Sequence, residues 1–233
     1  MPTLTSPAYI RQSGAADQAI GYEWRGTADF NKENEKLAKQ LVTMSARACL
    51  AFAAGLAEWV VWRLEGRSDF GAPLQMIEAA WVAQLDARYV KIPTEYEFAE
   101  RSGPVDGVLL ATKDLLESAL RSYNTPSAKN LFGKTVYLYQ LARHVVPDTK
   151  PFDVWVKASI ARLNAIYPRV DTDVKGEPVP REAVDTTAEF GKEAAPEQLS
   201  AFLRGIEPAS NRYLRTPEEL VAAGFAGTPY QLG

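Results

Sequence analysis

The sequence predicts an all-α protein, an antiparallel bundle of about five core helices with irregular N-terminal and C-terminal extensions. Three observations predict this fold. Apolar residues recur at three- and four-residue intervals between residues 29 and 167. Most prolines stand at the ends of these periodic segments. No segment of four or more residues alternates cleanly with β-branched side chains, so little or no sheet is expected.

The N-terminal part combines an irregular segment with a long helical stretch. Residues 1–27 are punctuated by prolines and glycines, which predicts irregular structure. From Asp29 to Leu64 the apolar residues follow helical spacing, which predicts one very long helix or two helices joined near Gly55. Gly66 supplies the stop signal.

Four further helices complete the predicted core of residues 28–167. They cover residues 72–89, 104–123, 127–147 and 151–167, with a connection over residues 91–103 that holds at most one helical turn. Pro73 and Pro104 fall in first turns, where the missing N–H costs nothing. Ser127 is the predicted N-cap of its helix.

The C-terminal part, residues 168–233, differs in character from the core. Residues 168–195 are predicted to be an extended acidic linker. Two short helices, over residues 196–205 and 216–223, are predicted to follow it and to pack on the core. The second has a capping signature, with Thr216 at the N-cap and Glu219 three residues later.

Composition excludes several classes of function. The chain of 233 residues has 26 Lys and Arg against 29 Asp and Glu and no basic run, so nucleic-acid binding is not expected. Cys49 is the single cysteine, which excludes an intrachain disulfide and a multi-cysteine zinc site. His144 is the single histidine, so no metalloprotease or di-iron motif is present. We expect no metal and no cofactor.

The most apolar stretch, residues 48–62, is predicted to be a buried central helix. It is interrupted by Glu58 and is shorter than the about 20 residues that a membrane span needs. The first residues lack the basic and apolar regions of a signal peptide. A cytoplasmic location without membrane contact is therefore expected. In that apolar run Cys49 is expected to be a buried, unreactive thiol.

Two short segments resemble known binding loops but lack their context. Residues 128–135 are similar to the nucleotide-binding P-loop, with Lys134 and Thr135 in the phosphate and magnesium positions, yet they contain one glycine and follow a predicted helix. Residues 171–182 resemble a calcium-binding EF-hand loop, but Lys175 stands where an oxygen ligand belongs. We interpret the first as part of a helix and the second as solvated linker.

Three carboxylates lie on or beside the predicted tryptophan-bearing helices and could carry chemistry. Glu58, Glu78 and Asp86 could act as general acids and bases or as magnesium ligands. Arg63 and Arg88 could instead neutralise them as ordinary ion pairs.

The leading functional hypothesis is a non-enzymatic, cytoplasmic protein-binding module. By analogy with other small acidic all-helical proteins, it would be an immunity protein or an adaptor, which binds and neutralises or carries a cognate protein. Its acidic residues would attract a partner with a basic surface. The candidate binding residues are Asp171, Asp173, Glu177, Glu182, Asp185 and Glu189.

Two alternatives stay open. One is a helical magnesium- or carboxylate-dependent hydrolase or lyase that uses Glu58, Glu78 or Asp86. The other is a structural subunit of a larger assembly, and the sequence leaves homo-oligomer formation undecided.

Overall fold

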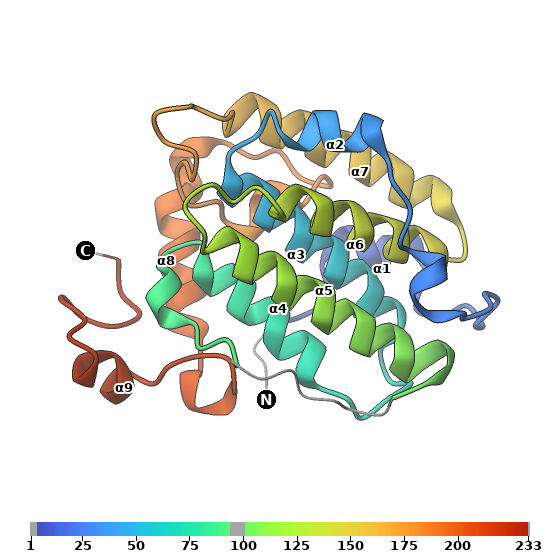
Figure 1. Ribbon diagram of the computed structural model, residues 1–233, viewed down its shortest axis with the longest axis horizontal. Helices are drawn as coiled ribbons and strands as arrows, with labels where there is room; N and C mark the ends of the chain where they lie inside the picture. The colour runs from blue at the N-terminus through green and yellow to red at the C-terminus, as the bar shows by residue number, and fades with distance from the viewer. Residues whose placement is uncertain (1–3, 94–100, 233) are drawn as a thin grey trace.

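The computed structural model describes residues 4–93 and 101–232, and over these residues the protein is all-α, as the sequence predicts (Figure 1). Part of the predicted connection, residues 94–100, lies outside the described residues. The α-helices are α1 (Ala8–Ser13), α2 (Glu35–Leu41), α3 (Ala46–Arg63), α4 (Ala72–Ala83), α5 (Val108–Tyr123), α6 (Leu131–Val145), α7 (Thr149–Ile166), α8 (Ala195–Gly205) and α9 (Pro217–Ala222).

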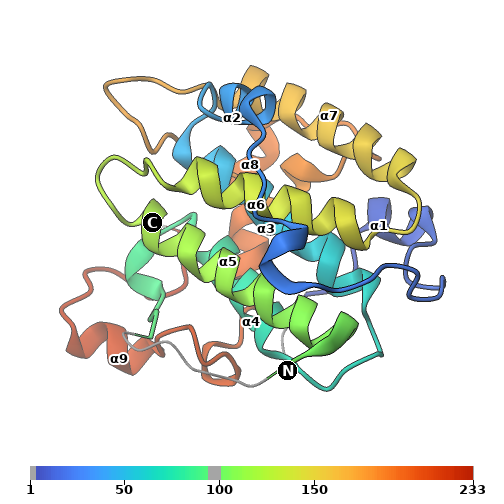
Figure 2. The same ribbon diagram turned by 45° about the vertical axis from the view of Figure 1, so that its right-hand side comes forward.

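The core is built around α3, which packs against α4, α5, α6 and α7 (Figures 1 and 2). Residues 48–60 of this helix are all buried, as expected for the most apolar stretch. Small alanine side chains let the neighbouring helices approach closely. At Gly55 the approach of α7 is tight, because an added Cβ would lie 3.0 Å from Cζ2 of the Trp155 ring on α7.

The predicted joint near Gly55 is wrong. Gly55 lies inside the continuous helix α3, and the chain breaks earlier, between Leu41 and Ala46. Ser45 ends the break as the N-cap of α3, where its Oγ accepts a hydrogen bond of 3.2 Å from the backbone N–H of Ala48. The apolar spacing runs across this break, so periodicity alone gave no sign of it.

Two other predicted helix ends are also corrected. The predicted helix 72–89 ends at Ala83, and Asp86 then caps a short 3₁₀ turn, Ala87–Tyr89. Ser127 is not the N-cap of α6, which begins at Leu131 after a turn in which Ala128 has a φ of 48°.

The acidic segment after α7 is packed on the bundle. We name residues 168–190 the strap. Its carbonyls at Val174 and Lys175 accept hydrogen bonds from the first backbone N–H groups of α3. Further along, Nε1 of Trp155 donates a hydrogen bond of 2.8 Å to the carbonyl of Val184, which is buried. The strap contains turns and the 3₁₀ turn Arg181–Val184, and it is fixed at both ends of its course over the bundle.

The last part of the chain docks beside the end of α4 (Figure 1). Backbone hydrogen bonds join Lys91 to Tyr213 and Arg215 to Tyr89, at 2.9 and 2.8 Å. The Tyr230 ring stacks on Tyr89 with 4.6 Å between centroids. The capping box of α9 is present as predicted. Among the helices of the described residues, none combines the length and the apolar character that crossing a bilayer requires.

Candidate functional site

Glu58 occupies a buried position in the middle of α3 and is held by two donors. Arg181 of the strap forms a bidentate ion pair with Glu58, in which Nε donates to Oε1 at 2.8 Å and Nη2 donates to Oε2 at 2.9 Å. Nε1 of Trp81, on α4, donates to the same Oε1 at 2.8 Å. Both carboxylate oxygens are therefore engaged, and the group acts here as a counter-ion that joins α3, α4 and the strap.

Arg181 lines a cavity of about 220 Å³ that the N-terminal segment closes on one side. Arg181 Nη2 also donates to the carbonyl of Thr5 at 2.6 Å. Burial alone lowers the pKa of Arg181, and the charge of Glu58 outweighs it, so that the net shift is upward. Burial, followed by the Glu58 charge, raises the pKa of Tyr9 well above its usual value. Tyr9 therefore stays a neutral phenol in the physiological pH range.

The other two candidate acids have partners of their own. Glu78 is buried on α4 and accepts a hydrogen bond of 2.9 Å from Nδ2 of Asn211. Asp86 forms the predicted ion pair with Arg88, at 2.6 Å between Oδ2 and Nη2. The hydrogen bonds from the Arg88 side chain are the largest influence on the pKa of Asp86 and hold it below its usual value. Each of the three carboxylates is thus engaged by a different partner.

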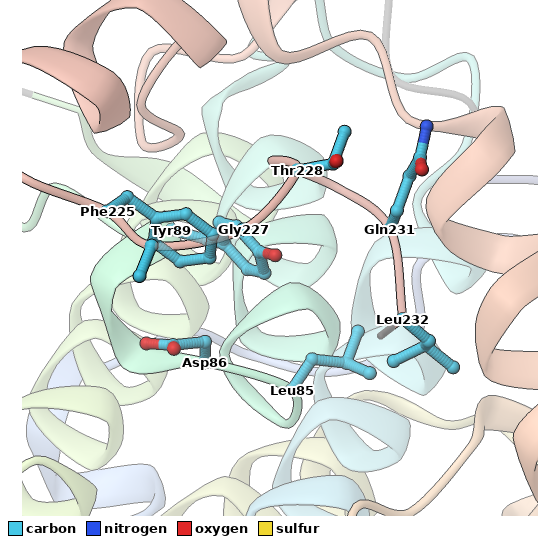
Figure 3. Close-up of a pocket in the computed structure, with 9 residues that line it drawn as sticks. Leu85, Asp86, Tyr89, Phe225, Gly227, Thr228, Gln231 and Leu232 are labelled. Carbon is cyan, nitrogen blue, oxygen red and sulfur yellow. The ribbon is translucent and has the colours of Figure 1, made fainter.

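Asp86 lies at the mouth of a cavity of about 350 Å³ formed with the end of the chain (Figure 3). Tyr89 and Phe225 form one aromatic wall, and the guanidinium carbon of Arg88 lies 4.5 Å from the centroid of the Phe225 ring. From Gly227, beside Tyr89, the chain passes Thr228 and reaches Gln231 and Leu232 on the opposite side (Figure 3). Because the Asp86 carboxylate is already paired with Arg88, this cavity offers aromatic surface for binding and no pair of acids for catalysis.

The six acidic candidates lie on the strap, and five of them are exposed. Glu177 pairs with Lys192 at 2.8 Å, and Asp173 and Asp185 accept backbone hydrogen bonds from Gly176 and Thr187. Asp171, Glu182 and Glu189 point to solvent, whereas Asp185 is partly buried.

The six acids of the strap outnumber its three bases, Arg169, Lys175 and Arg181. Arg169 pairs with Asp171 at 3.4 Å, the charge of Arg181 is used on Glu58, and Lys175 lies 4.9 Å from the centroid of the Tyr123 ring. The outer surface of the strap is therefore acidic.

Arg63 does not pair with any of the candidate acids, contrary to the sequence-based suggestion. It is fully buried at the end of α3, and its Nη2 donates to the carbonyl of Ala19 at 2.8 Å. Nearby, the His144 ring at the end of α6 contacts the carbonyl of Glu23 at 2.8 Å. The sequence analysis did not predict that Arg63 and His144 lie close together. A usable signal was the absence of any acid three or four positions from Arg63, where a helical ion pair would form.

The remaining motif residues have structural roles. Thr135 is buried inside α6 and donates to the carbonyl of Leu131 at 2.9 Å, so it is not presented to a phosphate. Cys49 is buried 3.4 Å from the Thr135 hydroxyl, and burial raises the pKa of its thiol to about 12. Over residues 4–93 and 101–232, no group of three His, Cys, Asp or Glu side chains converges as a metal site would require.

Comparison of the chain with family models, curated proteins and solved structures finds no match. The function is therefore argued from the residues and their geometry.

Proposed function

We propose that this protein is a protein-binding module whose strap docks on a basic surface of a partner protein. The observation that carries the proposal is the fixed acidic strap, which exposes five carboxylates while the interior cation Arg181 is held by Glu58. An immunity protein that neutralises a cationic toxin and an adaptor that carries a cationic cargo both fit this description.

The geometry supports binding for two physical reasons. A surface that is already ordered loses little conformational freedom when it binds, so more of the interaction energy appears as affinity. Complementary charge raises the association rate, and this effect falls with ionic strength. The anchoring of the strap at Val174 and Val184 supplies the first condition, and its exposed acids supply the second.

The test compares two variants that lose the same number of charges. The strap variant changes Asp171, Asp173 and Asp185 to Asn and Glu177, Glu182 and Glu189 to Gln. Amides keep the acceptor oxygens that Asp173 and Asp185 use in the turns. The control variant makes the same kind of change at exposed acids elsewhere, namely Asp17, Glu33, Glu35, Glu65, Asp69 and Glu207.

Both variants and the unmodified chain are used to capture partners from the native cells at moderate salt, followed by mass spectrometry. We expect one stoichiometric partner that the control variant retains and the strap variant loses, and an association rate that falls with ionic strength. Retention of the partner by the strap variant would refute the proposal. Capture only of further copies of the chain would favour a structural subunit instead.

A further inference from the structure

The Arg63 guanidinium is buried with most of its hydrogen-bonding capacity unused. Arg63 is the last residue of α3 and its side chain has no exposed surface. Its Nη2 donates to the carbonyl of Ala19, whereas Nε and Nη1 find no acceptor among the described residues. A guanidinium carries five N–H donors, so this environment leaves most of them unsatisfied.

This burial is costly unless an anion compensates for it. No carboxylate of the described residues lies within ion-pair distance of Arg63, and the nearby charge that acts on it most is that of Arg67, another cation. The carbonyls at the end of α3 provide about half a negative charge, which offsets only part of the cost. Arg181, the other interior arginine that borders α3, has a full carboxylate partner in Glu58. Arg63 lacks its counterpart.

A cavity of about 210 Å³ lies beside Arg63. Tyr22 and His144 form one side of it, with 5.4 Å between their ring centroids. Val145, Val146 and Pro147 at the end of α6 contribute apolar surface. Burial raises the pKa of Tyr22 to about 12, so Tyr22 brings no negative charge to the cavity. The lining thus combines the Arg63 cation with the Tyr22 and His144 rings and apolar surface. The buried Asp29 carboxylate lies 3.6 Å from Nε2 of His144 and is paired with Arg25 at 2.8 Å.

We propose that this cavity binds a small organic carboxylate, with its carboxylate on Arg63 and its short apolar part against Val145, Val146 and Pro147. Guanidinium groups match planar carboxylates in geometry and charge. A single buried guanidinium suits a monoanion, whereas a phosphate dianion would need further donors. Residues 19–22 cover Arg63, so binding includes an outward movement of this segment, and the incoming oxygens occupy the donors that are now unsatisfied.

The experiment measures binding of butyrate, propionate and acetate by titration calorimetry and by thermal unfolding, with sodium chloride at matched ionic strength as the reference. We expect saturable binding and a rise in the melting temperature that increases with ligand concentration, strongest for butyrate. Arg63→Met should weaken butyrate binding at least tenfold. Lys150→Met removes an exposed charge three residues after Pro147 and serves as the control, with binding weakened less than threefold.

Stability without ligand provides an independent readout. Methionine has a similar length and no charge, so Arg63→Met should leave the melting temperature in chloride unchanged or raised. If that variant does not fold, Arg63→Lys keeps the charge but loses the planar donors, and it should fold and weaken butyrate binding. Absence of saturable carboxylate binding, equal binding by Arg63→Met, or a response to phosphate alone would each overturn the proposal.

Discussion

Removing the cation that faces Glu58 is the sharpest test of how the helices and the strap are held together. In Arg181→Met the buried carboxylate loses both hydrogen bonds to the guanidinium, at 2.8 and 2.9 Å, and keeps only the bond from Trp81. Loss of one partner of a buried ion pair costs about 3–5 kcal/mol. The Arg181 side chain keeps 20% of its exposure, so water reaches it and the lower end of that range applies.

We therefore expect Arg181→Met to lower the free energy of unfolding by about 3 kcal/mol at neutral pH. At roughly 2–4 °C per kcal/mol for a chain of this size, the melting temperature should fall by about 6–12 °C. Urea unfolding followed by tryptophan fluorescence measures the change, because Trp81 reports directly on the Glu58 environment.

The double variant Glu58→Gln with Arg181→Met separates two effects, the loss of the hydrogen bonds between these side chains and the burial of an unpaired Glu58 charge. Its amide oxygen still accepts the hydrogen bond from Trp81, and no charge remains buried. We expect it to recover at least half of the stability that the single variant loses. A loss below about 1 kcal/mol in Arg181→Met, the range of surface pairs, would refute the reasoning, as would a double variant no more stable than the single one.

Three further predictions follow from local environments. Gly55→Ala should lower stability by about 1–3 kcal/mol because its Cβ meets the tightly packed Trp155 ring, whereas Gly133→Ala, with open space around it, should gain up to about 1 kcal/mol; urea unfolding of both variants tests this. Cys49 should resist thiol reagents in the native protein near neutral pH and react only after unfolding, because its pKa is about 12; rapid native labelling would contradict this. Burial raises the pKa of Asp29, but hydrogen bonds from Arg25 outweigh burial, so the pKa lies below its usual value of 3.8 and the stability that Asp29 contributes is present at neutral pH and lost as the pH falls below about 4. Asp29→Asn should therefore be less stable than the unmodified protein at pH 7 and approach its stability in acid. A difference in stability that stays constant with pH would refute this.

The helical architecture could be predicted because it depends on local patterns. Apolar spacing located the long helices, and the capping signature at Thr216 located α9. The break before α3 was misplaced, because Ser45 lies in a stretch whose apolar spacing is uninterrupted and its capping role depends on the local backbone. Periodicity reports which face of a helix is buried, but it does not report where one helix stops and the next one begins.

The sequence did not identify the ion-pair partner of a side chain where that partner lies far away along the chain. Glu58 has no base three or four residues away, and its cation comes from Arg181, which is 123 positions later. The same reasoning assigned Arg63 to an ion pair that does not form. Arg88, the other base suggested to neutralise the candidate acids, does pair with one of them, its near neighbour Asp86. The acidic character of the strap was visible from composition, whereas its anchoring on Trp155 and α3 required the three-dimensional fold.

The late position of Arg181 has a consequence for synthesis on the ribosome. With 123 positions between the two partners, and about 5–20 residues added each second, α3 emerges about 6–25 s before the cation that neutralises Glu58. During that interval the nascent bundle lacks its interior counter-ion and the Val184 carbonyl that accepts from Trp155. We expect a polypeptide released before residue 181 to be less stable and more readily cleaved, because it lacks both contacts. Completion of the fold thus acts as a check on completion of translation through the strap.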